Sequence, residues 1–266
     1  MIQDRLPLVS IIMPAYNSEK HIRESIESVL SQSMEDWELL VIDDASQDET
    51  ADIVQGYALL DKRISLFKND RNIGTAKSRN IGLDNSKANW VAFLDSDDIW
   101  YSNKLERQLE IAEKEGAELV CSSYCILYEN TGKRVNYRIP SKISYEKLLR
   151  ENIIGCSTVL IRSQLFKNRR FLAESYHEDY VMWLSLLKSG CNAIGCDEVL
   201  VEWRSSEIGR SFDKRRAALN RWKIYRSIEH LSLPKACFVF CVYGVRGIKK
   251  HKSSFLNKRA PGENDL

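Results

Sequence analysis

The sequence predicts an α/β fold: a doubly wound, mostly parallel sheet with helices on both faces. Short apolar runs alternate with helical patterns over the first hundred residues, which is typical of a parallel sheet. Several of these runs end directly in polar or acidic residues, as strands do where an open α/β sheet binds its ligand. The clearest case is the run 90–94, which leads straight into Asp95, Asp97 and Asp98.

The first half is expected to contain four strands and three helices. The strands are expected at 8–13, 37–42, 64–67 and 90–94, and the helices at 19–32, in a stretch ending near 60, and at about 75–85. Pro14 is expected to end the first strand. Asn17 and Ser18 are expected to cap the first helix, and Ser46 and Asp48 the second.

The second half is expected to continue with shorter elements. Helices are expected at 103–114, at 145–150 and after 177–179, strands at 118–121, 157–161, around 193 and at 199–203, and a hairpin from 124–128 and 134–138. The predicted division is a catalytic domain at 1–210, with a nucleotide-binding half at about 7–115 and an acceptor half at about 116–210. A basic amphipathic helical extension at 211–257 and a flexible tail at 258–266 follow.

Charge is unevenly distributed along the 266 residues. The formal net charge is +2, but the stretch 213–259 carries thirteen Lys or Arg against two acids. Its apolar run 236–245 is about half of the ~20 residues that a spanning helix needs. This predicts an interfacial helix on an anionic membrane, or else a helix packed on the body with a solvated basic face. The seven cysteines lack zinc spacing and no signal peptide is apparent, so a cytoplasmic protein with reduced thiols is expected.

Polar groups follow four predicted strand ends or turns, at 14–17, 43–44, 95–98 and 178–179. Carboxyl ends of neighbouring parallel strands lie about 5 Å apart, so these groups should meet in one cleft. Each acid alone could be a helix cap. Together they would repel one another unless a divalent cation and a nucleotide diphosphate lie between them.

Other nucleotide and hydrolase signatures are absent from the sequence. No Gly-x-Gly-x-x-Gly follows the first strand, and no Gly-x4-Gly-Lys-Ser/Thr occurs. The four scattered histidines do not suggest a Ser/His/Asp triad.

Four segments together resemble glycosyltransferase family 2, whose members have a GT-A fold and include bacterial surface-polysaccharide enzymes. They are Val9-Ser-Ile-Ile-Met-Pro-Ala-Tyr-Asn17, Val41-Ile-Asp-Asp-Ala-Ser46, Ser78-Arg-Asn-Ile-Gly82 and Phe93-Leu-Asp-Ser-Asp-Asp98, followed by His177-Glu178-Asp179. The resemblance covers roughly residues 7–205.

The resemblance implies a set of nucleotide-sugar-binding residues. They are Pro14, Ala15, Tyr16, Asn17, Asp44, Arg79, Asp95, Ser96 and Arg204. Tyr16 would lie against the base and Asp44 would accept the N3–H of uracil. The alternatives are a core tyrosine, a helix cap and, for Arg79, a surface salt bridge. Family members often carry a histidine after Trp203-Arg204, which is absent here, leaving Arg204 or Arg210 to hold the diphosphate.

The resemblance also implies the catalytic groups. Asp97 and Asp95 would hold Mn²⁺ or Mg²⁺, which prefer oxygen ligands. Asp98 is expected either as a second ligand or as a cap of the next helix. Asp179 is the favoured general base for an inverting transfer, with Glu178 the second choice.

The predicted function is therefore an inverting, metal-dependent glycosyltransferase. It would move one sugar, from a UDP-linked donor, to a saccharide acceptor that is lipid-linked, at the inner face of a bacterial cell membrane, with no nucleic acid partner. The sequence leaves two alternatives: a sugar nucleotidyltransferase, or a catalytically inactive, membrane-associated GT-A scaffold. The first lacks its expected Gly-rich loop after strand one.

Overall fold

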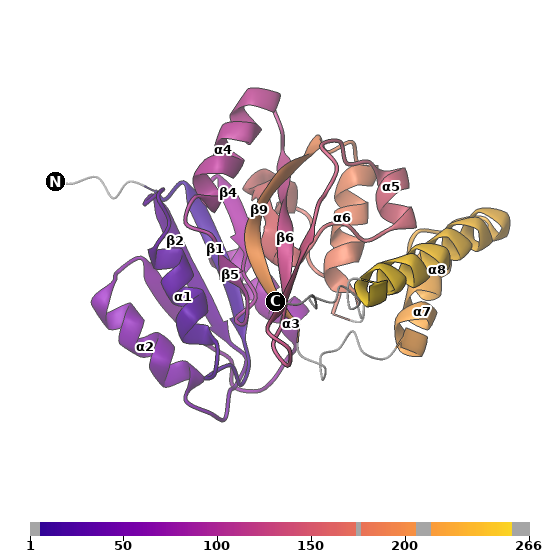
Figure 1. Ribbon diagram of the computed structural model, residues 1–266. Helices are drawn as coiled ribbons and strands as arrows, with labels where there is room; N and C mark the ends of the chain where they lie inside the picture. Colours follow the sequence, from indigo (N-terminus) through magenta and orange to yellow (C-terminus); the bar gives the residue numbers. More distant parts are fainter. Residues whose placement is uncertain (1–5, 174–176, 206–213, 257–266) are drawn as a thin grey trace, which may run out of the picture.

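The protein folds as an α/β structure around one nine-stranded sheet. The computed structural model describes residues 6–173, 177–205 and 214–256. Helices cover both faces of the sheet, and the last two helices lie at one end of the molecule (Figure 1). The strand order is β3-β2-β1-β4-β8-β6-β9-β5, with β7 paired to the outer part of β6.

The first half of the chain forms the parallel part of this sheet. Its strands are β1 (Val9–Ala15), β2 (Trp37–Asp43), β3 (Ile64–Lys68) and β4 (Trp90–Phe93), joined by the helices α1 (Ile22–Leu30), α2 (Thr50–Leu60) and α3 (Thr75–Asn85). β2 and β4 both pair in parallel with β1, and β3 pairs in parallel with β2. The carboxyl ends of all four strands therefore lie at one edge.

The second half adds antiparallel strands. Its elements are β5 (Ile99–Trp100), α4 (Lys104–Glu115), β6 (Leu119–Tyr128), β7 (Lys133–Tyr137), α5 (Tyr145–Arg150), β8 (Val159–Arg162), α6 (Glu178–Lys188) and β9 (Ala193–Ser205). β8 runs antiparallel between β4 and β6, and so joins the two halves into one sheet. β6 and β9 pair in parallel over their full length.

Two apolar layers hold the helices on the sheet. On one face, α1, α2 and α4 pack on side chains such as Ile11, Met13 and Val41. On the other face, α3, α5 and α6 pack on side chains such as Ile12 and Ile42. Strand β1 is buried on both faces over all seven residues, which explains its continuous apolar sequence.

The C-terminal segment is helical and packs on the body. It consists of α7 (Lys214–Lys223), a π-helical turn at Ile224–Ile228, and α8 (Leu233–Leu256). Ile224, Tyr225 and Val239 are buried in the layer that contains α5 and α6. The Tyr225 hydroxyl donates a hydrogen bond to the Leu149 carbonyl. No helix among the described residues combines the length and apolar character that crossing a bilayer requires.

Two of the predicted domain boundaries lie at or near residues that the structure does not describe. Residue 210 falls within the undescribed segment 206–213, and the tail 258–266 falls within the undescribed segment 257–266. The division into these domains therefore stays a prediction.

The element types were largely predicted, but several boundaries were wrong. β1 does not end at Pro14 and continues to Ala15. The Ile12 carbonyl accepts from Leu94 N–H, whereas the Ala15 carbonyl accepts from Asp44 N–H. Alternation along the strand turns Pro14 toward the β4 side, where pairing has already ended, so its missing N–H breaks no ladder bond.

The predicted start of the first helix was also wrong. α1 begins at Ile22, and neither Asn17 nor Ser18 caps it, because their polar groups bind other loops. For the second helix, α2 begins at Thr50 and its N-cap residue is Glu49, which makes no side-chain capping bond, so the capping prediction for Ser46 and Asp48 is wrong. Asp48 instead accepts from the N–H of Thr50 in the turn that precedes the helix, and Ser46 Oγ accepts from Asn17 N–H.

The remaining differences concern strand length. The predicted strands 118–121 and 124–128 are one strand, β6, and those near 193 and at 199–203 are one strand, β9. The register shift near Ser122 and Ser123 explains why each looked interrupted. The two-residue strand β5 was too short to predict.

Replacing Gly82 by alanine is expected to destabilise the protein. Gly82 lies on the buried face of α3, where a β-carbon would collide with Ile12 and come within 3.1 Å of Ile42 Cδ1. Overpacking of this kind costs about 1–3 kcal/mol. Urea unfolding should show a lower midpoint with an unchanged slope.

Gly56→Ala on α2 is the matched control. No atom lies within 4 Å of the β-carbon position there, and the backbone is helical. Because alanine is the better helix former, Gly56→Ala should raise stability by up to about 1 kcal/mol. Equal midpoints for Gly82→Ala and the wild type would show that α3 does not approach the sheet as closely as described.

Candidate active site

The loops after β1 and β2 are bound to each other at the carboxyl edge of the sheet. Asn17 N–H donates to Ser46 Oγ at 3.0 Å, and Asn17 Oδ1 accepts from Gln47 N–H at 2.8 Å. Asn17 and Ala45 both have positive φ, at 48° and 63°. Left-handed backbone at non-glycine residues is uncommon and concentrates at functional sites. The two loops therefore form one rim of the site.

Tyr16 is an exposed aromatic residue of this rim. It is 48% exposed, and it follows Pro14 and Ala15, which are both buried. The alternative prediction of a core tyrosine is wrong. An aromatic ring on this edge offers a flat apolar surface to a ligand.

Asp44 fixes the loop between β3 and α3. Its carboxylate is buried and accepts from Asn69 Nδ2, Ile73 N–H and Gly74 N–H at 2.8 to 2.9 Å. None of these bonds goes to α2, so the prediction of a cap on that helix is wrong for Asp44.

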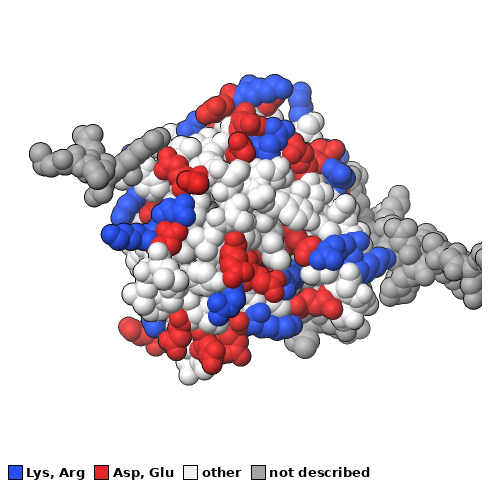
Figure 2. Space-filling model, turned by 60° about the vertical axis from the view of Figure 1, so that its left-hand side comes forward, with Lys and Arg blue, Asp and Glu red and all other residues white. Residues whose placement is uncertain are grey.

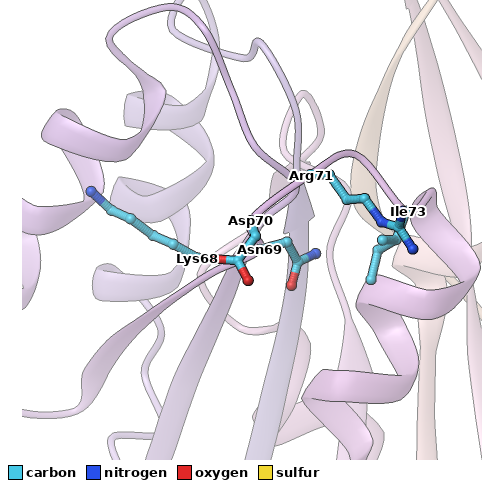
Figure 3. Close-up of a pocket in the computed structure, with 5 residues that line it drawn as sticks. All are labelled: Lys68, Asn69, Asp70, Arg71 and Ile73. Atoms are coloured by element: carbon cyan, nitrogen blue, oxygen red, sulfur yellow. The ribbon is translucent and has the colours of Figure 1, made fainter.

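A cavity of about 280 Å³ opens beside this loop (Figure 3). It is lined by Lys68, Asn69, Asp70, Arg71 and Ile73. Asn69 and Arg71 were missed by the sequence analysis. The signal that could have found them is the polar run 69–72 that follows the third strand.

Arg79 joins three elements at the centre of the site. From α3, its guanidinium donates to Asp95 Oδ1 at 2.6 Å and to Glu178 Oε1 at 2.9 Å. Only 3% of Arg79 is exposed, so the alternative of a surface salt bridge is wrong. Burial alone would lower the pKa of Arg79, but the acids around it outweigh burial and raise it. The end of β4 and the start of α6 are thereby held together.

The carboxylate of Asp98 binds Ser157 and Arg204, which neither the prediction of a second metal ligand nor that of a helix cap anticipated. It is buried, and its carboxylate accepts from the Ser157 hydroxyl at 2.5 Å and from Arg204 N–H at 3.2 Å. The strand β5 follows it, not a helix, so the prediction of a cap is wrong. The Ser157 hydroxyl also accepts from Asp95 N–H at 3.1 Å. Ser157 therefore orders the acidic segment from behind, and nothing in the sequence pointed to it.

Ser96 ties the acidic segment to the first loop. Its hydroxyl lies 2.7 Å from the Ser18 hydroxyl, and its carbonyl accepts from Ser25 Oγ at 3.0 Å. The predicted donor-site segments at 14–17 and 95–98 are thus brought together.

Asp97 is the most exposed acid of this segment. It is exposed, and no hydrogen bond from another described residue reaches its carboxylate. Loss of hydration, and then repulsion from Asp95, raises the pKa of Asp97 to about 6. The repulsion from Asp95 marks an excess of negative charge, which a bound cation would relieve.

The described residues contain no group of three or more His, Cys, Asp or Glu that could hold a metal by itself. Asp97, with the oxygen of Asp95 that Arg79 does not bind, offers one or two carboxylates instead. This suits Mg²⁺ or Mn²⁺, which usually take one or two carboxylates and complete their shell with water and substrate phosphates.

Glu178 and Asp179 begin α6 and lie beside Arg79. Glu178 is 9% exposed and pairs with Arg79, whereas Asp179 is partly buried and its Oδ1 accepts from Tyr180 N–H at 2.7 Å. Burial raises the pKa of Asp179, and the charge of Arg79 partly offsets this. Asp179 is therefore the carboxylate of the pair that is not committed to an ion pair with Arg79.

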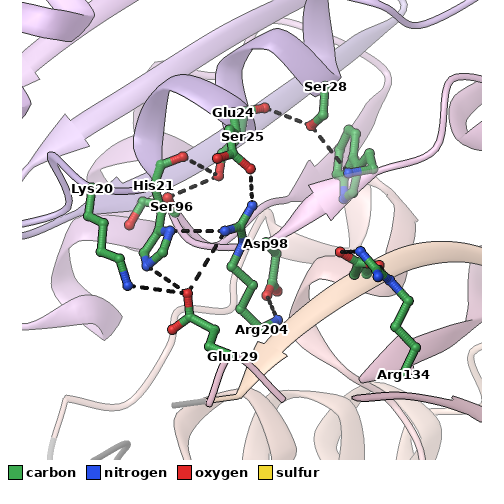
Figure 4. Close-up of polar contacts among 12 residues, drawn as sticks. Lys20, His21, Glu24, Ser25, Ser28, Ser96, Asp98, Glu129, Arg134 and Arg204 are labelled. Atoms are coloured by element: carbon green, nitrogen blue, oxygen red, sulfur yellow. Dashed lines mark hydrogen bonds and ion pairs between the residues drawn. The ribbon is translucent and has the colours of Figure 1, made fainter. Parts of the chain in front are cut away.

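Arg204 lies at the end of β9, where its guanidinium faces α1 (Figure 4). It contacts Glu24, His21 Nδ1 at 3.1 Å and Glu129 Oε1 at 3.9 Å. These protein partners were not foreseen, and a role in holding diphosphate stays a prediction. Arg210 lies outside the described residues.

Comparison with known proteins decides the family. The family model "Glycosyl transferase family 2" matches residues 10–180, which include both acids of α6 and the four motif segments except Val9. The chain belongs to glycosyltransferase family 2. The prediction from the motifs is confirmed.

Relatives in this family match the chain over nearly its full length. The Escherichia coli protein WfgD, named a UDP-Glc:α-D-GlcNAc-diphosphoundecaprenol β-1,3-glucosyltransferase, is 39% identical over 94% of this chain and 97% of its own. The Bacillus subtilis protein TuaG, a glycosyltransferase named for teichuronic acid biosynthesis, is 37% identical over 92% of this chain and 97% of its own.

Solved structures confirm the GT-A fold. Staphylococcus aureus TarS 1–349 in complex with UDP-GlcNAc aligns with a TM-score of 0.72 at 19% identity, over 89% of this chain and 71% of that one. A longer TarS chain is covered only to 42%. A mannosyltransferase from Pyrobaculum calidifontis in complex with GDP-Man and Mn²⁺ aligns with a TM-score of 0.66 at 18% identity, over 90% and 69%.

Arg79→Met is expected to lower the free energy of unfolding by about 3 kcal/mol, because it leaves buried Glu178 without a counter-charge. The double variant Arg79→Met/Glu178→Gln should recover part of this loss, since the uncompensated charge is then gone. Chemical denaturation of the three proteins checks both statements.

The control is Arg107→Met, which removes ion pairs with Glu198 and Glu110, and the three side chains are 39%, 45% and 54% exposed. Because solvent screens exposed pairs, Arg107→Met should change stability little. Equal losses for Arg79→Met and Arg107→Met would contradict the central place of Arg79.

Proposed function

We propose that this chain is an inverting, divalent-cation-dependent glycosyltransferase that transfers one sugar from a UDP-linked donor to a hydroxyl of a lipid-linked glycan. The observation that carries the proposal is the Arg79 fork. It holds the Asp95–Asp97 segment on one side and the Glu178–Asp179 pair on the other. The segment with the candidate metal-binding acid and the pair with the candidate base are thereby bound to the same guanidinium.

The nucleotide end of the donor is assigned to the rim and the cavity beside it. Tyr16 would stack on the base, with Pro14, Ala15 and Asn17 forming the rim around it. Asp44 fixes the loop with three hydrogen bonds, and Oδ2 uses one of them, so a lone pair of Oδ2 is left to accept the uracil N3–H. The TarS complexes with UDP and UDP-GlcNAc support a uridine donor.

The diphosphate end is assigned to the acidic segment. Asp97 and Asp95 would hold Mn²⁺ or Mg²⁺, and Ser96 keeps their loop in place. When bound, the cation supplies charge stabilisation for the departing diphosphate. The Mn²⁺ complex of the Pyrobaculum mannosyltransferase supports this assignment.

Asp179 is assigned as the general base. It would take the proton of the acceptor hydroxyl while that oxygen bonds to C1 of the sugar. The C1–oxygen bond to the diphosphate breaks on the opposite face, so the configuration at C1 inverts. Glu178 is occupied by Arg79, and its role is to hold Arg79 in place.

The names of two relatives and the basic C-terminal stretch support the assignment of a lipid-linked acceptor. WfgD carries a diphosphoundecaprenol-linked acceptor in its name, and TuaG is named for a surface polysaccharide. The stretch 213–259 carries thirteen Lys or Arg against two acids. We therefore place the protein in the cytoplasm, on the anionic inner face of a bacterial membrane.

The test is donor turnover across a panel of UDP- and GDP-sugars, with Mn²⁺, with Mg²⁺ or with EDTA, and with a synthetic GlcNAc-diphosphate-lipid acceptor. We expect turnover with a UDP-hexose, release of UDP, and loss of turnover in EDTA. Turnover that persists in EDTA would contradict the proposed cation dependence. Absence of turnover with every donor and acceptor would contradict the proposed glycosyl transfer.

Asp179→Asn is expected to lower kcat by about 10²–10⁴, because a positioned base contributes that much. Donor affinity, measured by thermal shift with UDP-sugar and Mn²⁺, should be unchanged. Glu35→Gln, a change outside the site, is the control. If Asp179→Asn keeps wild-type kcat, another group is the base.

As the pH is lowered, kcat should begin to fall at a higher pH than it would if the base were a carboxylate with the ordinary pKa. Burial raises the pKa of Asp179, and only its ionised form accepts a proton. As pH falls through that raised pKa, kcat should drop about tenfold per unit. A pH–kcat profile that stays flat well into the acid range would contradict the assignment.

A further inference from the structure

One side of α8 exposes a continuous apolar stripe. Leu233, Cys237, Cys241 and Val245 recur every four residues and so follow one line along the helix. Leu233 is 56% exposed and Val245 53%, and both cysteines are exposed. Phe238 lies beside this line and is 57% exposed. We call these five residues the α8 stripe.

The opposite side of α8 is apolar as well and is already covered. Ala236 and Val239 are buried in the core layer of α5 and α6. Phe240, which lies between that side and the α8 stripe, is partly buried and meets the Trp222 ring at 5.4 Å. From Leu233 to Val245 the helix carries a single charged residue, Lys235, which pairs with Glu146. A helix that is apolar all round normally has both sides out of water.

The surroundings of the α8 stripe indicate what covers it. α8 runs on to Leu256, and its sequence after Val245 contains Arg246, Lys249, Lys250 and Lys252 with no acid. Apolar side chains followed by a run of cations match the boundary of an anionic bilayer, where the former enter the acyl region and the latter meet phosphates. In contrast, acidic and basic side chains are interspersed on the face shown in Figure 2.

The position of α8 permits this contact. It lies at one end of the molecule, at the opposite end from α2, and extends beyond the body (Figure 1). Its 24 residues span about 36 Å at 1.5 Å per residue.

We propose that α8 lies in the surface of an anionic membrane with the α8 stripe inserted among the lipids. The proposal deepens the function assigned above and rests on its lipid-linked acceptor. It also links the membrane to the chemistry. Arg221 of α7 stacks on the Tyr180 ring at 3.7 Å and on the Tyr243 ring of α8 at 4.8 Å, and Tyr180 follows Asp179 in the chain. Binding of α8 to the membrane would therefore hold Asp179, the candidate base, at a fixed distance from the lipid surface.

The experiment is flotation of the full chain with vesicles of phosphatidylglycerol and phosphatidylethanolamine, and with vesicles of phosphatidylcholine alone. We expect binding to the anionic vesicles, weakened at high salt by screening of the basic run. The double variant Leu233→Asp/Cys241→Asp should lower the partition coefficient about tenfold or more, because two apolar insertions are lost. No binding to anionic vesicles, or equal binding by this variant, overturns the proposal.

The matched control is Leu59→Asp/Leu60→Asp on α2. These residues are 79% and 87% exposed and belong to α2, which lies at the opposite end of the molecule from α8 (Figure 1). The control should bind vesicles as the wild type does, and both variants should keep the wild-type melting temperature. A comparable loss in the control would mean that any exposed leucine contributes, and would overturn the assignment to α8.

Cys237 and Cys241 supply a second measurement on the unaltered protein. The other five cysteines are buried, so a water-soluble maleimide should label these two first. Anionic vesicles should slow this labelling about tenfold, and phosphatidylcholine vesicles should not. Slow labelling without lipid, together with a dimer in solution that the stripe variant dissociates, would assign the stripe to a second copy and overturn the proposal.

Neither measurement needs a sugar donor. Membrane binding without turnover of any nucleotide sugar would therefore remove the assigned reaction and leave the α8 contact standing. Turnover with a soluble acceptor but no vesicle binding would overturn the α8 contact and leave the assigned reaction standing.

Discussion

The buried guanidinium of Arg79 is the interaction on which the site depends. Two carboxylates from β4 and α6 lie within 2.9 Å of it, and a third, Asp179, lies in its field. Without this charge, Asp95, Glu178 and Asp179 would repel one another and the raised pKa of Asp179 would rise further. The fork geometry of arginine explains why one residue serves both partners, since a lysine offers a single point charge.

Much of the fold could be predicted because its signals are local. The apolar runs of β1, β2 and β4 and the pattern of α3 are set by burial on the two faces of the sheet, so periodicity identifies them. The lengths of β6 and β9 could not be predicted, because their polar interruptions are absorbed by pairing between segments some seventy residues apart. The continuation of β1 through Pro14 is a similar case. It is possible because β4 ends before it reaches Pro14, so the missing N–H of proline breaks no bond between the strands.

The sequence predicted which residues lie in the candidate site, but not which partners their side chains bind. The motif residues at 14–17, 44 and 95–98 lie at one edge, as their position after strands implied, and Arg79 of α3 reaches Asp95 there. What each side chain binds depends on distant partners: Ser157 behind Asp98, Asn69 on Asp44, and Glu24 on Arg204. No pattern in a single sequence encodes such pairs, since each member is an ordinary surface residue by type.

The hairpin of β6 and β7 has a mechanical consequence. Glu129 at its tip lies 3.4 Å from Lys20 Nζ and 3.2 Å from His21 Nε2, while Arg204 donates to the other ring nitrogen. Burial lowers the pKa of His21, and a neutral ring protonated on Nε2 satisfies both neighbours. The hairpin thus reaches from the second half of the chain to the first and connects the two at a second point besides the sheet. A hinge that swung the halves apart would have to break this cluster, which leaves loop rearrangement as the less costly way to admit a donor and release its product.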